Sequence, residues 1–171
     1  MLSDGEIAHL RGLLEAAFVG DPEDAFRDID WEHAIGGTHV LLELDRTIVA
    51  HASVVERAIR VAGHLLRTGY VEAVATAPEH QRTGLGTLVM EEVGALIQAE
   101  YQLGALGTGE HGFYERLGWQ TWKGPTSVRT PNGEVRTPDE DGYVMVLETP
   151  TTPRLDPGDP ISCDLRTGDA W

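Results

Sequence analysis

The stretch EHQRTGLGT, residues 79 to 87, decides how this sequence is interpreted. An apolar run over residues 65–77 precedes it and predicts a strand, which Pro78 ends. Apolar residues then recur at three- and four-residue steps over residues 85–97, which predicts a helix that packs one face on a sheet. A strand, a Gln-x-x-Gly-x-Gly turn and such a helix form an anion site, because free amides at the helix N-terminus point outward.

The glycine motif alone has weak specificity. It lacks the Lys-Ser/Thr ending of a P-loop and the three glycines of a dinucleotide fingerprint. A flexible turn that caps a helix is the simpler interpretation of so short a motif. The rest of the sequence must therefore decide between the two.

Composition points to one ordinary globular domain in a reducing compartment. The 171 residues suffice for a full core, and 41% hydrophobic with 24% charged residues is usual for such a domain. Cys163 is the single cysteine, which excludes an internal disulfide. The N-terminal sequence lacks the pattern of a signal peptide, and no apolar run is long enough to span a bilayer. We expect a cytoplasmic protein.

The chain is strongly acidic, with 28 Asp and Glu against 13 Lys and Arg and a formal net charge of -15. This balance disfavours nucleic acid and anionic membranes as partners and suits a cationic ligand. A solubilising acidic surface is the alternative explanation. The acids gather in residues 21–32, in residues 139–141 and in a tail that ends Asp169-Ala170-Trp171.

Periodicity and turn residues predict alternating helices and strands. The spacing of Ser3 and Glu6 predicts a capping box for a first helix, and Asp30 is expected to cap a second one that ends at Ile35. The tail from Thr149 onward, rich in Pro, Asp and Thr, is expected to run as an extended loop. Strands are predicted at residues 38–44, 47–55 with a possible extension to 60, 65–77, 101–106, 119–122 and 142–147, and a short helix at residues 111–117.

The order of these elements resembles the GCN5-related N-acetyltransferase superfamily, in which this loop holds the pyrophosphate of acetyl-coenzyme A. GFYERLGW, residues 112 to 119, is similar to its late motif, and VEAVAT, residues 71 to 76, to its cofactor-pairing strand. The resemblance implies an α/β (α+β) fold in one domain, residues 1–171. A mixed, mostly antiparallel central sheet would be flanked by helices, its splayed strands would hold acetyl-CoA, and residues 149–171 would fold back toward the substrate cleft.

Within the superfamily the sequence resembles the aminoglycoside 2'-N-acetyltransferases. This resemblance implies direct transfer of acetyl from acetyl-CoA to the 2'-amine of an aminoglycoside, without a covalent acyl-enzyme. The shared stretches run from about Ala16 to the last residue: DWEH (30–33), GYVE (69–72), YQLGAL (101–106), GPTSV (124–128), RTPD (136–139) and RTGDAW (166–171).

The resemblance assigns roles to three catalytic residues. Glu72 would act as general base through water, because an ammonium must lose a proton before it attacks a thioester. The amide of Val74 would bind the acetyl oxygen, and Tyr114 would protonate the departing thiolate. An ion pair of Glu72 with Arg67, and a core or surface role for Tyr114, are the structural alternatives.

The resemblance also assigns a cofactor site to the end of this strand and the loop that follows. Val74 and Thr76 would pair with the pantetheine arm like an added strand. Gln81 would frame the loop. The pyrophosphate would meet the backbone amides of Arg82, Thr83, Gly84, Leu85 and Gly86, with the Arg82 side chain and the Thr87 hydroxyl as further donors.

For a polycationic sugar, the family places acids opposite the amines. Matching residues here are Asp21, Asp30, Glu72, Glu140, Asp169 and the terminal carboxylate of Trp171. Each has a structural alternative, since Asp30 is a good N-cap, Asp21 suits a turn before proline, and terminal residues usually fray.

The sequence departs from the family pattern in several places. Glu140 stands where an aspartate is expected, and Gly107 where a serine is expected, with Thr108 as a candidate substitute. Extra residues separate Asp21 from Asp30, and the usual first strand is missing or reduced to the first two residues.

Three further expectations concern metal, substrate and assembly. We expect no metal site, because the seven histidines form no ligand cluster; His39 and His51, in separate strands, are expected to be core or hydrogen-bonded residues.

Alternatives to the aminoglycoside activity are acetylation of a polyamine or a cell-envelope amino sugar, or a non-catalytic module that binds acyl-CoA or aminoglycoside. A homodimer is common in the superfamily.

Overall fold

A computed structural model describes residues 2–19 and 25–171 of the chain. They form two compact units, which we describe separately. The first comprises Met1–Val55 and Val71–Val93, and the second comprises Glu56–Tyr70 and Gly94–Trp171.

Two helices open the first unit. Helix α1 (Asp4–Ala17) begins with the predicted capping box: Glu6 N–H donates to Ser3 Oγ at 3.3 Å, and Ser3 N–H donates to Glu6 Oε2 at 2.7 Å. Helix α2 (Asp28–Ile35) starts two residues before the predicted position. Asp30 is therefore not its N-cap.

The first unit contains β1 (Thr38–Leu44), the first part of β2 (Thr47–Val61) and the second part of β3 (His64–Thr76). β1 and β2 pair antiparallel through the predicted two-residue turn. Both turn residues, Asp45 and Arg46, are left-handed, with φ of 49° and 67°, as a tight hairpin requires.

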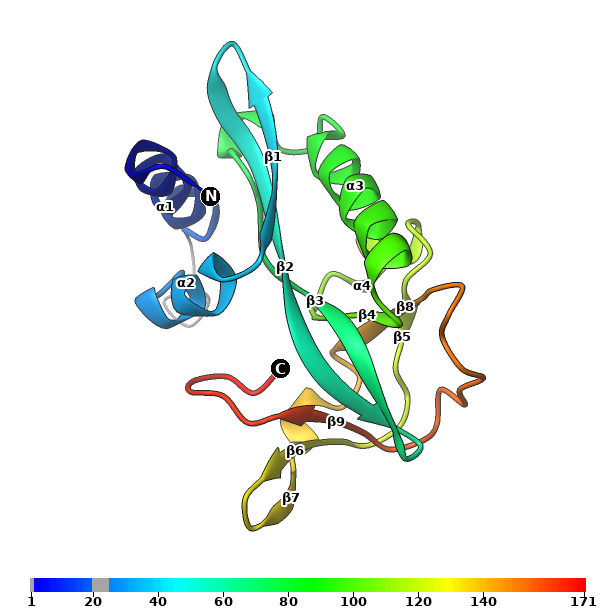
Figure 1. Cartoon of the computed structure of the whole chain (residues 1–171). Helices are drawn as coiled ribbons and strands as arrows, with labels where there is room; N and C mark the ends of the chain where they lie inside the picture. The colour runs from blue at the N-terminus through cyan, green and yellow to red at the C-terminus, as the bar shows by residue number, and fades with distance from the viewer. Residues whose placement is uncertain (1, 20–24) are drawn as a thin grey trace. The chain divides into compact units, whose positions relative to one another are not determined.

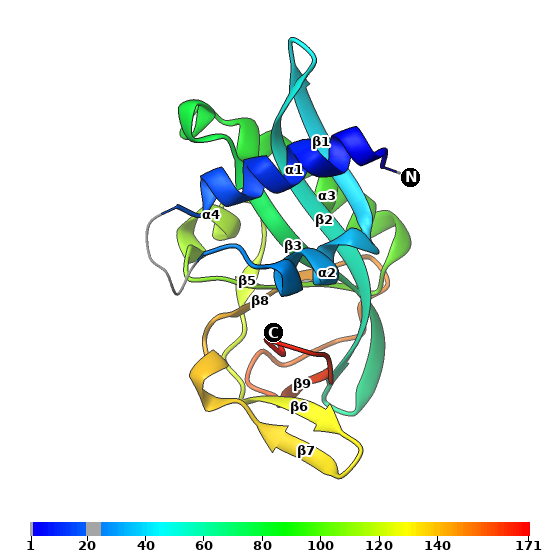
Figure 2. The ribbon, with the colours of Figure 1, turned by 90° about the vertical axis from the view of Figure 1, so that its left-hand side faces the viewer.

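Helices cover both faces of this small sheet. Within the first unit, α1 and α2 lie on one face and the first part of α3 (Leu85–Glu100) lies on the other (Figures 1 and 2). The apolar face of α1 contributes to a core with α2 and the strands, formed by Leu10, Leu13, Leu14, Trp31, Ile48, Val49, Ala75 and Ala77.

A mixed group of strands begins the second unit. β4 (Leu103–Gly107) is parallel to β3 and antiparallel to β8 (Val144–Glu148), and the short β5 (Gln120–Thr121) also pairs with β8. Helix α4 (His111–Glu115) occupies the predicted place between β4 and β5.

Three strands of the second unit were not predicted. β6 (Thr126–Thr130) forms a hairpin with β7 (Gly133–Arg136), and β9 (Ile161–Asp164) lies parallel to β6 and antiparallel to the end of β2. The expectation of a loop throughout the tail is wrong for β9, whose backbone finds partners on both sides. Gly124 lets the tail approach, since a Cβ there would lie 1.9 Å from the Asp159 carbonyl oxygen.

The strand order is β5-β8-β4-β3-β2-β9-β6-β7, with β1 on β2. Most of the pairings are antiparallel, which confirms the predicted mixed sheet. Short 3₁₀ turns, η1 (Pro78–His80) and η2 (Pro138–Glu140), follow β3 and β7. From residue 2, where the described chain starts, to α1 there is no strand. Among the described helices, none combines the length and apolarity that crossing a membrane requires.

Candidate active site

The predicted catalytic strand is the second part of β3, in the first unit. Glu72, Val74 and Thr76 are half-buried, while Ala73, Ala75 and Ala77 pack on or within the α1–α2 core. Every second residue of this stretch, from Ala73 to Ala77, therefore faces the core. Ala73, between Glu72 and Val74, has a left-handed backbone conformation with φ of 52°. No pattern in the sequence predicts this conformation.

Arg67 was the alternative partner considered for Glu72. It lies in the second unit, where its guanidinium pairs with Glu56 at 2.8 Å and covers the Tyr101 ring at 4.7 Å from the centroid. Glu56 raises the pKa of Arg67 by accepting its hydrogen bond. The charge of Arg67 is thus balanced by Glu56.

The glycine loop between β3 and α3 has the form that an anion site needs. Arg82 and Gly84 are both left-handed, with φ of 61° and 89°. The Gln81 side-chain amide donates to the Thr76 carbonyl at 3.3 Å, so Gln81 ties the loop to the end of β3. Leu88 N–H donates to the Gly84 carbonyl at 3.2 Å, and the amides before Leu88 therefore belong to the first turn of α3, where intrahelical acceptors are lacking.

This loop fits a coenzyme pyrophosphate on two structural grounds. A Cβ added at Gly84 would meet nothing within 4 Å, so the backbone borders open space. The loop and the first turn of α3 contain no acidic residue between Gln81 and Met90, which preserves the positive end of the helix dipole.

Tyr114 lies on α4, in the second unit. Its side chain is buried and makes edge-on contacts with Phe113 and Trp119, at centroid distances of 4.9 and 6.2 Å. Burial, with a smaller contribution from Glu110, raises the pKa of Tyr114 to about 12. An ordinary tyrosine already keeps its phenolic proton at neutral pH, as a proton donor must, and burial makes the phenol a weaker acid still.

Acidic residues gather around Glu140 in the second unit. Glu140 is half-buried at the end of η2. Burial raises the pKa of its carboxyl, and the nearby charges of Asp169 and Asp139 raise it further. Like charges held together in this way are stabilised by a bound cation.

The C-terminal residue is held in place by its neighbours. Trp171 is buried, and its indole Nε1–H donates to Thr137 Oγ1 at 3.1 Å. The carbonyl of Ala170 accepts from Arg57 NH1 at 2.7 Å, and Arg57 is itself buried and paired with Asp164 at 3.0 Å. The terminal carboxylate is therefore attached to a fixed residue.

Gly107, which stands where the family pattern has a serine, lies next to this end. A Cβ there would come within 3.7 Å of the Trp171 carbonyl carbon and 3.4 Å of the Tyr70 hydroxyl. The hydroxyl of Thr108 accepts from Glu110 N–H at 2.9 Å, so it serves the turn into α4.

One predicted substrate residue, Asp30, lies in α2 of the first unit. Asp30 accepts the Arg27 backbone N–H at 2.8 Å and forms an ion pair with the Arg27 guanidinium at 3.3 Å, which stabilises the start of α2. Asp21 lies outside the described residues.

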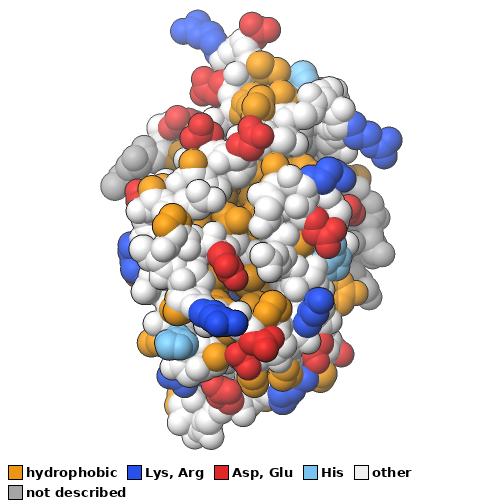
Figure 3. Space-filling model, turned by 90° about the vertical axis from the view of Figure 1, so that its right-hand side faces the viewer, with side chains coloured by type: hydrophobic (Ala, Val, Ile, Leu, Met, Phe, Trp, Pro, Cys, Tyr) orange, Lys and Arg blue, Asp and Glu red, His pale blue; other side chains and the backbone are white. Residues whose placement is uncertain are grey.

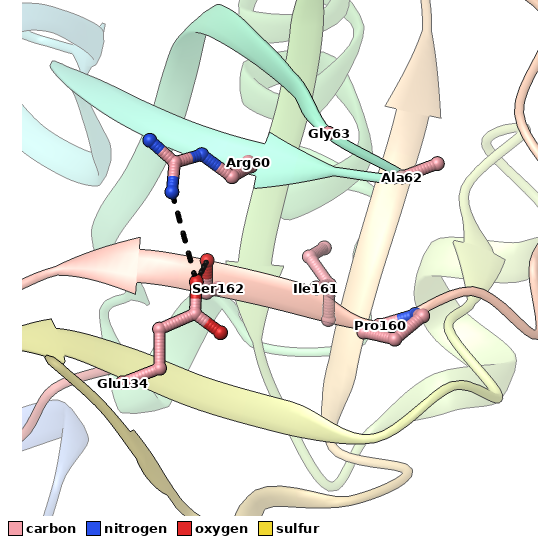
Figure 4. Close-up of a pocket in the computed structure, with 7 residues that line it drawn as sticks. All are labelled: Arg60, Ala62, Gly63, Glu134, Pro160, Ile161 and Ser162. Atoms are coloured by element: carbon pink, nitrogen blue, oxygen red, sulfur yellow. Dashed lines mark hydrogen bonds and ion pairs between the residues drawn. The ribbon is translucent and has the colours of Figure 1, made fainter.

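One face of the surface and one pocket were compared with the predicted site residues. On the face in Figure 3, acidic and basic side chains are interspersed. A shallow pocket of about 160 Å³ in the second unit is lined by residues of the β2–β3 turn, β7 and β9 (Figure 4). Arg60 and Glu134 pair there at 3.8 Å, so the two side chains neutralise each other. None of the predicted site residues lines this pocket.

No group of three or more potential metal ligands occurs among residues 2–19 and 25–171. His39 and His51, predicted as core or hydrogen-bonded histidines, are hydrogen-bonded to each other at 2.9 Å. That prediction is confirmed. Sequence reasoning did not foresee that His51 also contacts the carbonyl of Ala73.

Comparisons with known proteins agree with this architecture. Residues 1–122 match the model of the acetyltransferase (GNAT) domain. An aminoglycoside 2'-N-acetyltransferase of Mycolicibacterium fortuitum is 42% identical over 165 residues, which cover 94% of this chain and 83% of that protein.

Solved structures share the fold at low sequence identity. A GNAT family acetyltransferase from Brucella melitensis in complex with acetyl-CoA has a TM-score of 0.60 and 19% identity, and the match covers 91% of this chain and 90% of that one. Eis1 from Mycobacterium abscessus has a TM-score of 0.61 and 18% identity over 74% of this chain; the match spans only 31% of Eis1. The family match and the 42% identical relative show that the chain belongs to the GCN5-related N-acetyltransferase superfamily and, within it, to the aminoglycoside 2'-N-acetyltransferase family.

Proposed function

We propose that this acetyltransferase transfers the acetyl group of acetyl-CoA to the 2'-amine of an aminoglycoside. The relative from Mycolicibacterium fortuitum carries that activity in its name. The observation in this chain that carries the proposal is the acidic group of Glu140, Asp139 and Asp169, beside a C-terminal residue that is buried rather than frayed. Several carboxylates in fixed positions are what a rigid polycation needs for tight binding.

Acetyl-CoA would supply the acetyl group as an activated thioester. The amides of residues 82–86 would bind its pyrophosphate at the N-terminus of α3, aided by the Arg82 guanidinium and the Thr87 hydroxyl. Val74 and Thr76 would pair with the pantetheine arm along β3. Gln81 would contribute indirectly, because its hydrogen bond to Thr76 connects the strand to the loop.

Three residues would carry the proton and charge changes. Glu72 would accept the proton of the substrate ammonium through water, which frees the nitrogen lone pair. The Val74 N–H would donate to the acetyl oxygen as negative charge develops on it. Tyr114 would donate its phenolic proton to the sulfur leaving group, a role that its raised pKa permits.

For the substrate, Glu140, Asp169 and the Trp171 carboxylate would face amines of the sugar rings, with Asp30 and Asp21 as further acids. Asp30 would have to bind the substrate while it is paired with Arg27. Its contribution is accordingly expected to be smaller than that of Asp169.

The test is a thiol-release panel with acetyl-CoA and amines of different classes. We expect coenzyme A release with aminoglycosides that carry a 2'-amine and little with linear polyamines or simple amino sugars. Efficient turnover of a polyamine or an amino sugar, with none of any aminoglycoside, would overturn the substrate assignment.

The substitution Glu72→Gln separates an enzyme from a binding module. The amide keeps the shape of the side chain but cannot accept a proton at neutral pH. Turnover should fall by roughly 100-fold, within the usual contribution of a general base, while acetyl-CoA affinity is retained. Unchanged turnover would remove Glu72 from the mechanism.

We also propose a cytoplasmic location and a homodimer. The buried thiol of Cys163, whose pKa is raised by burial, is consistent with a reducing compartment. The homodimer rests on the superfamily tendency, and light scattering at several concentrations tests it.

A further inference from the structure

A chain of hydrogen bonds connects two histidines to the catalytic strand within the first unit. The buried His51 lies with Nδ1 2.7 Å from the Ala73 carbonyl oxygen and Nε2 2.9 Å from His39 Nδ1. His39 Nε2 in turn lies 3.2 Å from the carbonyl oxygen of Ile35, the last residue of α2. The chain thus runs from α2 through β1 and β2 to β3.

The end of this chain is one half of the peptide group that contains the Val74 N–H. The Ala73 carbonyl and the Val74 N–H belong to the same planar peptide, in which C=O and N–H point in opposite directions. A contact that holds the carbonyl oxygen toward His51 therefore aims the Val74 N–H away from His51. The direction of that N–H is what an oxyanion donor requires to be fixed.

The backbone at this point needs such a contact. Ala73 has φ of 52°, which is unfavourable for a residue with a Cβ and persists only where surrounding contacts impose it. The ring of His51 supplies one of these contacts from the neighbouring strand. The left-handed conformation of Ala73 in β3 is therefore stabilised by the buried side chain of His51 in β2.

The proton of His51 can be placed from the chemistry of the Ala73 end of the chain. A carbonyl oxygen only accepts, so His51 Nδ1 must carry a proton. Burial is the main cause that lowers the pKa of His51 to about 4, and the charge of His39 contributes to the lowering, so the ring is neutral at neutral pH. Its Nε2 is then an acceptor for the Nδ1–H of His39, and His39 fixes the tautomer of His51. Since a neutral ring has one N–H, a neutral His39 that donates from Nδ1 makes no hydrogen bond from Nε2 to the Ile35 carbonyl.

We propose that His51 is a positioning residue for acetyl transfer, which holds and polarises the Ala73–Val74 peptide so that the Val74 N–H is fixed as the donor to the acetyl oxygen. This inference rests on the role proposed above for Val74. A hydrogen bond received by a peptide carbonyl strengthens the N–H of the same peptide as a donor. His39 acts one step further away, because it keeps the Nδ1 proton of His51 in place.

Two substitutions at position 51 separate this role from simple packing. The side-chain nitrogen of Asn takes the place of histidine Nδ1, and that of Gln takes the place of Nε2. His51→Asn should keep the bond to Ala73 and retain kcat within about 3-fold, whereas His51→Gln should lose it and lower kcat by roughly 10- to 100-fold, somewhat less than deletion of an oxyanion donor.

Ser53→Ala is the matched control. Ser53 is buried in the same strand and donates from Oγ to the Ala34 carbonyl at 2.6 Å, a bond that does not involve Ala73. We expect it to lower the melting temperature without lowering kcat. An equal loss of kcat in Ser53→Ala and His51→Gln, or equal kcat in the Asn and Gln variants, would overturn the proposal.

The tautomer gives a readout that needs no substrate. Two-bond ¹H–¹⁵N spectra of the histidine rings should show His51 protonated at Nδ1 and unprotonated at Nε2 at neutral pH. The opposite tautomer would contradict the inference. The substrate proposal can fail without the His51 proposal. If the tautomer is as stated but the enzyme acetylates a different amine, only the substrate assignment is wrong. The role of His51 is then tested by measuring kcat with that amine.

Discussion

At the scale of single residues, burial decides which chemistry each side chain can perform. Tyr114 is enclosed by aromatic neighbours, which keeps its phenol protonated. His51 is enclosed between strands, which keeps its imidazole neutral. Glu140 is partly buried beside other acids, and burial, with the charges of Asp169 and Asp139, raises the pKa of its carboxyl. In each case the environment, rather than the residue type, fits the group for its proposed role.

Tyr114→Phe tests the proton donor. The phenyl ring keeps the contacts with Phe113 and Trp119 but has no proton to give, so kcat should fall by roughly 100-fold, within the range of general acid catalysis. KM for both substrates should change little. Steady-state thiol release measures both constants, and an unchanged kcat at neutral pH would assign Tyr114 to the core alone.

The stability of the protein should depend on pH through His51. Its folded pKa, about 4, lies below the ordinary value of 6.5, so the unfolded chain binds the proton more readily. Stability therefore falls as pH falls from about 6.5 to 4, by up to roughly 3 kcal/mol at about 1.4 kcal/mol per pKa unit. His39 is the titratable neighbour that acts on this group.

Urea unfolding at several pH values measures this contribution. In His51→Asn the acid-side loss of stability should be smaller than in the wild type. The same slope in both proteins would show that His51 is not the group responsible.

Sequence reasoning reached some of these residues and missed others for a physical reason. Glu72 and Tyr114 could be proposed as catalytic residues because they lie at fixed positions in motifs. The left-handed Ala73 was missed, because an alanine carries no sign of positive φ. The contact of His51 with Ala73 was missed because it depends on strand register, which one sequence does not specify.

At the scale of elements, the loop before α3 and the C-terminal tail are the two segments on which we propose that binding depends. The loop combines two left-handed residues with the start of a helix and is expected to bind an anion. The tail combines β9 with a buried last residue and is expected to bind a cation.

Gly84→Ala should weaken acetyl-CoA binding. A Cβ at this left-handed position costs about 1 kcal/mol and projects into the open space that the pyrophosphate would use. KM for acetyl-CoA should rise by roughly 10-fold, the equivalent of about 1.4 kcal/mol.

Gly63→Ala is the control for backbone strain. Gly63 lies in the β2–β3 turn with φ of 83°, and a Cβ there would also meet nothing within 4 Å. The two variants should lose similar stability, but only Gly84→Ala should raise KM for acetyl-CoA. An equal rise in both would mean that strain, not the anion site, is responsible.

Deletion of Trp171 tests the tail. The deletion removes the buried indole and moves the terminal carboxylate to Ala170, so KM for the aminoglycoside should rise by at least roughly 10-fold, the equivalent of about 1.4 kcal/mol. KM for acetyl-CoA should change less than 3-fold. Equal losses for both substrates would instead indicate misfolding.

Hydrophobic periodicity predicted some of the helices and strands and missed others. Strands with β-branched runs and the long α3 were predicted close to their observed bounds, because their patterns are strong. The β6–β7 hairpin was missed although Asn132-Gly133 is a turn signal, because its strands have few apolar residues. β9 was missed because Pro and Asp residues around it favour a loop.

At the scale of the whole molecule, an acidic chain provides one local site for an anion and a general preference for a cation. We propose that the net charge of -15 attracts a polycationic substrate from solution, and that the backbone amides of residues 82–86 bind acetyl-CoA without a basic surface. The membership of the chain in the aminoglycoside 2'-N-acetyltransferase family agrees with this division.

The central claim is that the 2'-amine is the acetyl acceptor. The most direct measurement compares an aminoglycoside that carries a 2'-amine with the matched compound that carries a 2'-hydroxyl, by thiol release and by NMR of the product. The account predicts one coenzyme A released per 2'-amino molecule, with the acetyl group on the 2'-nitrogen, and no turnover of the 2'-hydroxyl compound. Acetylation of the two compounds at equal rates, or of any other nitrogen, would contradict it.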